Sequence, residues 1–283
     1  MKITTLIENE APASCPDLVS EWGLSLHIEF GGRSILFDTG KSGAFADNAK
    51  RLDIDIGSVE AAALSHHHFD HGGGLKRFLE INSRANVYLG KSPQGDCQIK
   101  ILKFFRKYIG LDKSLMREYP DRFVVVGEPA EILPHVFVFP EIRRRYPEPA
   151  GNRRLYVSKS DGEMVHDDFS HEMVMAIEDH DGLVIFTGCS HNGLLNMVDT
   201  VSREFEGVPV KAVIGGFHLI SSPLFNSMAG DRREVEELGG SVLSYPVEMT
   251  YTGHCTGAKA FDVLKSVMGD RLTDIRTGTC FEV

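Results

Sequence analysis

The segment that most constrains this chain is a short turn crowded with imidazole and carboxylate groups. Residues 61–64 are apolar, and the turn after them carries His66, His68, Asp70 and His71 in the pattern H-x-H-x-D-H, followed by three glycines. Four such ligands within six residues cannot all bind one small ion, but they can serve two neighbouring ions with two ligands each. The chain must therefore fold so that a buried strand ends at a metal-binding turn.

The spacing within this turn has a physical basis. Residues two apart in an extended segment project to the same side, so His66 and His68 can close on one ion while His67 points away. Asp70 and His71 come after the bend begins and can face the second ion. The glycines that follow allow a tight bend and a helix close to the site. A chance cluster or a surface metal-binding tract is the alternative, and the apolar strand before the turn disfavours it.

Length and composition fit a globular protein. The chain has 283 residues, of which 42% are hydrophobic and 25% charged. We predict a single domain over 1–283. No stretch approaches the roughly 20 apolar residues of a membrane helix, and the N-terminus lacks a signal-peptide pattern, so we expect a cytoplasmic protein without a membrane partner. The five cysteines are odd in number and well separated, which disfavours a disulfide framework.

Charge is distributed unevenly along the chain. The net charge of −10 disfavours nucleic-acid binding. Residues 91–160 nevertheless hold 14 Lys and Arg against 8 Asp and Glu. We interpret this range as a basic insertion over the site that attracts a small anionic substrate, with a merely solvated helix face as the alternative. The basic residues concerned are Lys100, Lys103, Arg106, Lys107, Arg143, Arg144, Arg145, Arg153 and Arg154.

Hydrophobic periodicity predicts strands that alternate with helices in two halves of similar rhythm. Strands are expected at 3–8, 24–30, 34–37, 59–64, 85–89, 122–126, 173–177, 183–187, 210–214, 246–251 and near 274–282. Helices are expected at 43–52, 75–81, 98–109, 192–205, 231–243 and 258–268.

Two later turns repeat the arrangement of a strand that ends in glycine and histidine. The strand at 183–187 leads to Cys189 and His191, and the strand at 246–251 leads to His254. We predict that His191 completes the first ion's ligands and that His254 joins Asp70 and His71 at the second. A helix-capping or turn histidine is the alternative in each case. Cys189 is a bridging thiolate, a donor behind the ligands or an inert buried thiol.

Further candidates are less constrained by their context. His218 also ends a strand and is either a ligand or, as we favour, a proton donor to the substrate. Asp167, Asp168 and His171 precede a strand and either reach the site or belong to a loop with surface carboxylates. Three other histidines lack such context and are expected to be structural: His27, His135 and His180.

Several of these motifs together resemble the metallo-β-lactamase superfamily. They are the H-x-H-x-D-H turn, Leu-Phe-Asp-Thr-Gly at 36–40, Thr-Gly-Cys-Ser-His at 187–191, Gly-Gly-Phe-His-Leu at 215–219 and His-Cys-Thr-Gly at 254–257. Within the superfamily they resemble the subgroup named for the methanopterin-pathway dihydropterin ribofuranosylaminobenzene phosphate synthase.

The resemblance implies an α/β, four-layer αββα sandwich with two divalent metal ions at one edge between its sheets. Zinc is the metal it favours, with iron or manganese as alternatives. It also implies that Asp38 is a buried carboxylate that orients a ligand. The chain departs from most dinuclear members in one respect, because Cys189 stands where they carry a bridging aspartate. This leaves open whether the second position is filled.

The predicted function is that of a metal-dependent hydrolase or transferase using a metal-activated hydroxide. Paired ions lower the pKa of a bound water from about 15.7 toward 7. Asp70 would hold a metal and guide the proton of that water, and His218 would stabilise the leaving group. A phosphodiester is the favoured substrate, followed by a lactone or ester, and then by the substrates of a synthase-like transferase. A non-catalytic metal-holding sensor or binding protein is the alternative from another class.

Overall fold

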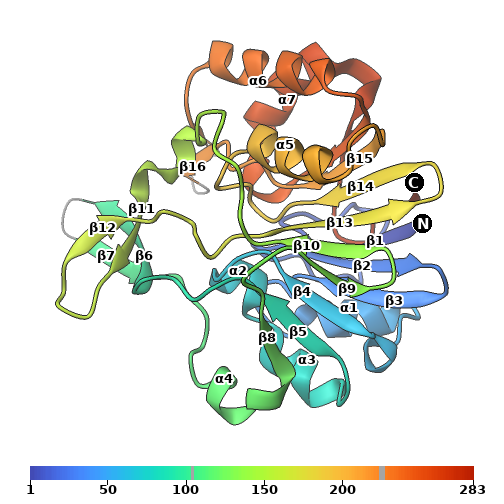
Figure 1. The fold of residues 1–283 in the computed structure, drawn as a ribbon, viewed down its shortest axis with the longest axis vertical. Helices are drawn as coiled ribbons and strands as arrows, with labels where there is room; N and C mark the ends of the chain where they lie inside the picture. Colours follow the sequence, from blue (N-terminus) through green and yellow to red (C-terminus); the bar gives the residue numbers. More distant parts are fainter. Residues whose placement is uncertain (103–104, 223–226) are drawn as a thin grey trace.

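Two seven-stranded sheets form the centre of the molecule (Figure 1). The structure is a computed structural model that describes residues 1–102, 105–222 and 227–283. The first sheet has the order β20-β1-β2-β3-β4-β5-β8, and the second has the order β19-β18-β15-β14-β13-β10-β9. The first comprises β1 (Lys2–Ile7), β2 (Ser25–Phe30), β3 (Arg33–Phe37), β4 (Ala61–Leu64), β5 (Asn86–Leu89), β8 (Phe123–Val125) and β20 (Cys280–Glu282). The second comprises β9 (Ala130–Leu133), β10 (Val136–Phe139), β13 (Val174–Asp179), β14 (Gly182–Phe186), β15 (Val210–Gly215), β18 (Val247–Thr252) and β19 (Leu272–Asp274).

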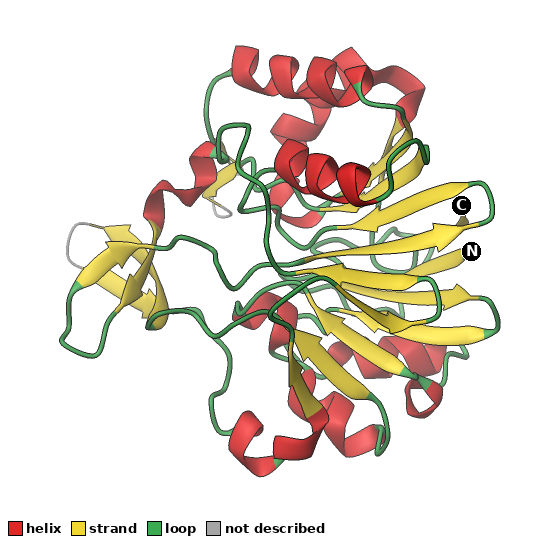
Figure 2. Ribbon diagram, in the orientation of Figure 1, coloured by secondary structure: helices red, strands yellow, loops and turns green. Residues whose placement is uncertain are grey.

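Helices cover the outer faces of both sheets, as Figure 2 shows. Apolar residues of the two inner faces, among them Phe37 and Phe186, form one core between the sheets. A second core joins the first sheet to its helices, and a third joins the second sheet to α5, α6 and α7. These layers confirm the predicted αββα sandwich. The helices are α1 (Ala44–Arg51), α2 (Phe69–Gly72), α3 (Leu75–Ile81), α4 (Leu115–Glu118), α5 (Leu194–Glu204), α6 (Arg232–Ser244) and α7 (Ala258–Met268).

Two smaller sheets stand beside the sandwich. Range 91–160, expected as one insertion, is shared among sheets: β8 joins the first large sheet, and β9 and β10 join the second. The small sheets contain β6 (Asp96–Leu102), β7 (Phe105–Tyr108), β11 (Leu155–Ser158), β12 (Met164–His166), β16 (Ile220–Ser222) and β17 (Ser227–Met228). The remaining strands of this range, β6, β7 and β11, build a four-stranded sheet with β12 at the side of the molecule (Figure 1).

Two predicted elements differ from the structure. The helix expected at 98–109 is wrong, because β6 and β7 form an antiparallel pair there, apart from 103–104, which lie outside the described residues. Apolar Ile99 and Ile101 alternate with polar neighbours, which is the period of a strand. The last expected strand is two strands in different sheets, β19 and β20, separated by a turn at Gly278 with φ of +87°.

Strand direction brings distant turns to one edge of the sandwich. In the first sheet β3 and β4 are parallel, and β1 runs in the same direction because two antiparallel pairings separate it from β3. In the second sheet β14, β15 and β18 are parallel neighbours. The carboxyl ends of each set therefore lie together, and these ends carry the histidine turns. None of the helices in the described ranges is long and apolar enough to cross a membrane.

Candidate metal centre

Asp38 organises the early histidine turn from the end of β3. Its Oδ1 accepts the backbone N–H of Ser65 at 2.7 Å, and its Oδ2 accepts the Ser65 hydroxyl at 2.7 Å. The same Oδ2 lies 2.6 Å from Nδ1 of His71. All three residues are buried. Asp38 thereby fixes the His71 ring so that Nε2 faces the other turns, which is the role the resemblance implied for it.

One cluster of imidazoles joins the early turn to the turn after β14. The ring centroids of His66 and His68 are 4.5 Å apart, and that of His191 lies 4.8 Å from His66 and 5.0 Å from His68. The Nε2 atom of each ring is buried and finds no hydrogen-bond partner among the described residues. Burial lowers the pKa of all three well below the usual value, so the rings are neutral. Neutral imidazoles with unpaired buried nitrogens fit a cation between them.

A second cluster joins the same turn to η5 (His254–Thr256). Nε2 of His71 lies 3.2 Å from Nε2 of His254, and the latter lies 3.5 Å from Oδ2 of Asp70. The Trp22 indole donates to that Oδ2 at 2.8 Å. Burial lowers the pKa of His254 to about 3. Burial also disfavours protonation of His71, but the charge and hydrogen bond of Asp38 outweigh it and raise its pKa to about 9. A cation here would take the place of that proton.

Cys189 lies between the two clusters. Its Sγ is 3.1 Å from Nε2 of His71. It also lies within 4.8 Å of ligand atoms of His66 and His191 on one side and of His254 on the other. Burial raises the pKa of this thiol well above its usual value in the metal-free protein. The sulfur thus occupies the position between both groups, and its donor chemistry suits zinc or iron beside imidazole.

The turns approach each other closely because of glycine and of left-handed backbone. A Cβ at Gly188 would lie 2.1 Å from Oγ of Ser65, so the end of β14 can touch the early turn only without a side chain there. Ser190, His218 and His254 have φ between +48° and +58°. Non-glycine residues in this region are uncommon and concentrate at functional sites.

Two buried glutamates that the sequence analysis missed hold the late turns. Glu172 accepts the backbone N–H groups of His191 and Asn192 at 2.8 and 2.7 Å. Glu8 accepts the backbone N–H of His254 at 2.6 Å. Burial raises the pKa of both carboxyl groups to about 7, partly offset by these hydrogen bonds. Glu8 lies at the end of the first predicted strand, and Glu172 follows His171 just before another. A position next to a strand was the only sequence feature that could have indicated these two glutamates.

His171 belongs to a hydrogen-bonded network rather than to either cluster. Its Nδ1 accepts the backbone N–H of His67 at 3.2 Å, so Nε2 carries the proton and faces Oδ2 of Asp167 at 3.2 Å. Cys97 is buried beside them, 3.9 Å from that Nε2. His68, Cys97, Asp167 and His171 have ligand atoms within 4.8 Å of one another, so a direct role of His171 toward a cation stays a prediction. Asp168, the other carboxylate named from the sequence, is exposed and accepts the N–H of Ser170.

Two further histidines, His67 and His218, differ in whether their rings face the clusters. His67 turns away from the clusters, and its Nε2 lies 3.0 Å from the carbonyl of Gly90. The ring of His218 lies 4.2 Å from that of His191, between centroids. Both of its nitrogens are buried and unpaired within the described part of the chain. It is therefore placed to reach a molecule bound at the first cluster.

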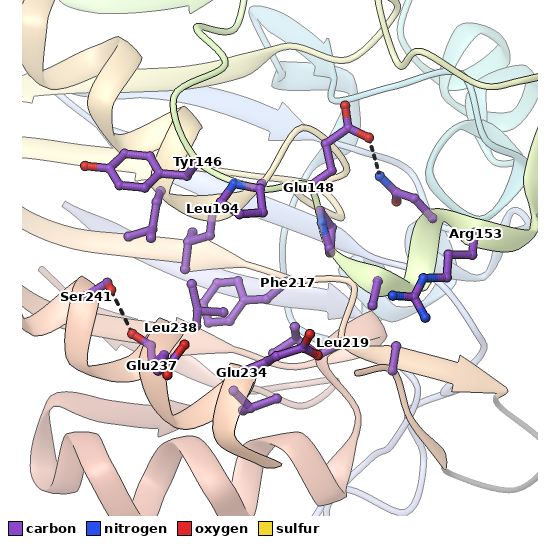
Figure 3. Close-up of a pocket in the computed structure, with 18 of the residues that line it drawn as sticks. Tyr146, Glu148, Arg153, Leu194, Phe217, Leu219, Glu234, Glu237, Leu238 and Ser241 are labelled. Carbon is purple, nitrogen blue, oxygen red and sulfur yellow. Dashed lines mark hydrogen bonds between the residues drawn. The ribbon is translucent and has the colours of Figure 1, made fainter. Parts of the chain in front are cut away.

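A cavity of about 720 Å³ is lined by residues of η3 (Ala150–Arg154), α5 and α6. Figure 3 shows Tyr146 at one end and Arg153 at the other, with Phe217 and Leu238 between them. Asn152 also lines this cavity and contacts His191. The cavity therefore combines an apolar floor with one arginine and four carboxylates, those of Glu148, Asp167, Glu234 and Glu237, and Asn152 connects it to the turn of His191.

Most arginines of the basic range have partners. Arg143, Arg144 and Arg145 pair with Glu204, Glu148 and Asp199 at 3.5, 3.1 and 3.2 Å. Arg154 donates to the carbonyls of Lys100, Ile101 and Ser221 and so ties β6 to β16. Lys103 lies outside the described residues. The expected basic rim is thus partly neutralised, and its role toward a substrate stays a prediction.

Comparison with known proteins defines the class. The model of the metallo-beta-lactamase superfamily matches residues 23–88. The chain is 32% identical over 278 residues to a protein of Methanocaldococcus jannaschii, covering 92% of this chain and 89% of the relative. That relative is named 7,8-dihydropterin-6-methyl-4-(beta-D-ribofuranosyl)-aminobenzene-5′-phosphate synthase. The chain belongs to the metallo-β-lactamase superfamily, and the expected similarity to the synthase subgroup is confirmed.

Solved structures agree with this assignment. A metal-dependent hydrolase of the β-lactamase superfamily, Tm1679, matches with a TM-score of 0.81 at 29% identity, over 100% of this chain and 99% of the other. Zn²⁺-bound PqqB from Methylobacterium extorquens matches with a TM-score of 0.58 at 11% identity, with full coverage of both chains. The second likeness concerns the fold alone.

Proposed function

We propose that this protein is a metal-dependent enzyme that hydrolyses a phosphate-bearing small molecule, with a phosphodiester as the favoured substrate. The observation that carries the proposal is the convergence of three unpaired Nε2 atoms, those of His66, His68 and His191, beside a second group of ligands. The chemistry of these side chains suits zinc, with iron or manganese as alternatives. The name of the related Tm1679, a metal-dependent hydrolase, supports the same class.

The side chains have distinct roles in this proposal. His66, His68 and His191 would hold one cation, and Asp70, His71 and His254 the other, with Cys189 between them. When bound there, divalent cations supply positive charge to a phosphoryl oxygen and acidify a water. Asp70 keeps one carboxylate oxygen fixed by Trp22 and can take up the proton of an attacking water through the other. His218 can donate a proton to the leaving group from its unpaired ring nitrogens.

The cavity lined by η3, α5 and α6 suits the organic part of a substrate. Its floor is apolar, with Leu194, Phe217 and Leu238, and Arg153 stands at one end (Figure 3). A guanidinium group is well suited to a phosphate oxygen. An aromatic or aliphatic part of a substrate would lie on this floor, with an anionic group against Arg153 and away from the carboxylates of Glu148, Glu234 and Glu237, which also line the cavity.

A synthase-like transferase is the second candidate. It is favoured by the 32% identity to a synthase whose product name contains a dihydropterin and a ribofuranosyl-aminobenzene phosphate. The same cavity and the same cations would serve a transfer in which an amine or carbon nucleophile replaces water. The two candidates share the phosphate-bearing substrate and differ in the acceptor.

The test compares both reactions on one preparation. Protein loaded with Zn²⁺, Mn²⁺ or Fe²⁺ is assayed on chromogenic phosphodiesters and lactones, and separately on an activated 6-methyl dihydropterin with a ribofuranosyl-aminobenzene phosphate. We expect phosphodiester turnover that His68→Ala abolishes together with metal content, while His180→Ala, at an exposed histidine, leaves both unchanged. Joined product without hydrolysis would favour the transferase, and tight ligand binding without either reaction would favour a sensor.

A further inference from the structure

Two asparagines hold the two late histidines in the same way. Asn152, in η3 (Ala150–Arg154), donates from Nδ2 to the carbonyl of His191 at 2.8 Å, and its Oδ1 lies 3.0 Å from Nδ1 of the same ring. Asn9, just after β1, donates to the carbonyl of His254 at 3.0 Å, and its Oδ1 lies 3.0 Å from Nδ1 of that ring. Each asparagine thus contacts one histidine at two points.

These contacts determine which ring nitrogen carries the proton. A backbone carbonyl only accepts hydrogen bonds, so the amide atom that faces it must be the NH₂ group of the asparagine. The other amide atom is then the oxygen, which also only accepts. Nδ1 of His191 and of His254 must therefore bear the hydrogen, and Nε2 of each ring keeps its lone pair. Those Nε2 atoms are the ones that face the two clusters.

Each ring is also supported by an aromatic side chain. His191 stacks on Phe169 with centroids 4.4 Å apart and an interplanar angle of 4°. Trp22 lies 5.0 Å from the ring of His254. These aromatic contacts restrict the ring plane of each histidine. The amide contact then determines the tautomer of a ring that is already oriented.

We propose that Asn152 and Asn9 are paired positioning residues, each fixing the tautomer of the one late histidine that completes a cation position. The two asparagines come from different parts of the chain and share no contact partner. It follows that the cation affinity of each position depends on its own asparagine. Asn152 sets the affinity of the His191 position, and Asn9 sets that of the His254 position. The proposal rests on the metal-binding part of the proposed function but requires no particular substrate.

The first experiment reads the tautomers directly in metal-free protein. Long-range ¹⁵N correlation spectra of the histidine rings distinguish a protonated Nδ1 from a protonated Nε2. We expect the Nδ1–H form for His191 and His254 in the unmodified protein. Asn152→Leu should change the tautomer of His191 alone, and Asn9→Leu that of His254 alone. Asn→Asp at either position keeps an acceptor for Nδ1–H and should restore the native tautomer.

The second experiment measures Zn²⁺ binding to the same variants by calorimetry against a competing chelator. Each leucine variant should weaken one equivalent of Zn²⁺ by about 10- to 100-fold, and the matching aspartate variant should recover most of it. The two leucine variants control each other, because each leaves intact the position that the other weakens. Where a leucine variant fails to fold, the aspartate variant and the native spectrum still decide the tautomer.

Nε2–H tautomers in the unmodified protein would overturn the proposal, as would unchanged Zn²⁺ binding in both leucine variants. Absence of turnover with the expected tautomers and affinities would instead count against the proposed function and leave the positioning roles intact.

Discussion

The early turn and the two late turns present the same kind of ligand by different means. In the early turn four ligands lie within six residues, and Asp38 alone binds two groups of Ser65 and the ring of His71. Each late turn presents one histidine and depends on a glutamate, an asparagine and an aromatic ring from other parts of the chain. The asparagine contacts span 39 residues for His191 and 245 for His254.

This difference predicts which substitutions should damage both cation positions and which only one. Damage to the early turn should disturb both cation positions and the fold around them, because one carboxylate serves several groups. Loss of a late histidine, or of the asparagine that holds it, should be confined to the position that this histidine completes, whereas Cys189 in the turn after β14 faces both positions. The predictions below test that contrast.

The largest effect should come from Asp38→Ala. The change leaves the Ser65 N–H and hydroxyl and the His71 ring without their buried acceptor. Loss of one member of a buried charged network costs about 3–5 kcal/mol. Urea unfolding of the metal-free variant measures this loss. A late-turn change such as Asn152→Asp should lower the free energy of unfolding much less. Equal losses of stability in the two variants would contradict the proposed difference between the early and late turns.

Metal binding should stabilise the protein through both kinds of turn. A single Zn²⁺ present at 100 times its dissociation constant adds about 2.7 kcal/mol to the free energy of unfolding. We expect the chelated protein to melt at a lower temperature than the loaded one. The difference should shrink in Asn9→Leu and Asn152→Leu and disappear in His68→Ala combined with His71→Ala. A melting temperature unaffected by chelator in the native protein would contradict metal binding at this site.

Gly188→Ala should separate the early turn from the β14 turn. Its Cβ would meet the side chain of Ser65 at 2.1 and 2.5 Å, so one of the two turns must shift. Overpacking of this kind costs about 1–3 kcal/mol. We expect reduced Zn²⁺ affinity at the first position along with the loss of stability. Gly127→Ala is the matched control, because only the end of the Lys91 side chain, at 3.9 Å, approaches its added Cβ.

The smallest effect should come from His27, which lies outside all of these turns. Burial lowers its pKa below the usual 6.5. Between the folded and unfolded pKa values the unfolded chain binds more protons, so the stability that neutral His27 contributes is lost as the pH falls below about 6.5. The free energy of unfolding of the metal-free protein can be measured by denaturation at pH values from 7.5 to 5. It should fall less steeply with pH in His27→Gln than in the native protein.

Most of the fold could be predicted because its signals are local. Apolar runs and glycine turns placed the strands that carry Asp38, His66 and His254, and helical periodicity placed α3, α5, α6 and α7. The helix predicted at 98–109 was wrong because the alternation that marks a strand covers only a few residues there, and the two strands are set by their pairing in the four-stranded sheet.

The candidate site could be predicted only in part. The histidines of the three turns and Cys189 could be named because imidazole and thiol groups after a strand are rare and chemically specific. Asn9, Asn152, Glu8 and Glu172 could not be named, because a carboxamide or carboxylate in a loop is common. Their roles depend on which backbone group lies within hydrogen-bond distance, and that is set by contacts between remote segments.

The sandwich was implied by the resemblance to the superfamily, whereas the ligand types, their spacing in the early turn and the strands that carry them could be inferred from the residues themselves. These follow from the period of the strand and from side-chain chemistry, which act over a few residues. Only the tertiary structure decided that Cys189 lies between the clusters, that Asp167 rather than Asp168 is buried beside His171, and that two asparagines fix two ring tautomers. These depend on the packing of one sheet against the other, where a shift of one ångström changes the partner of a hydrogen bond.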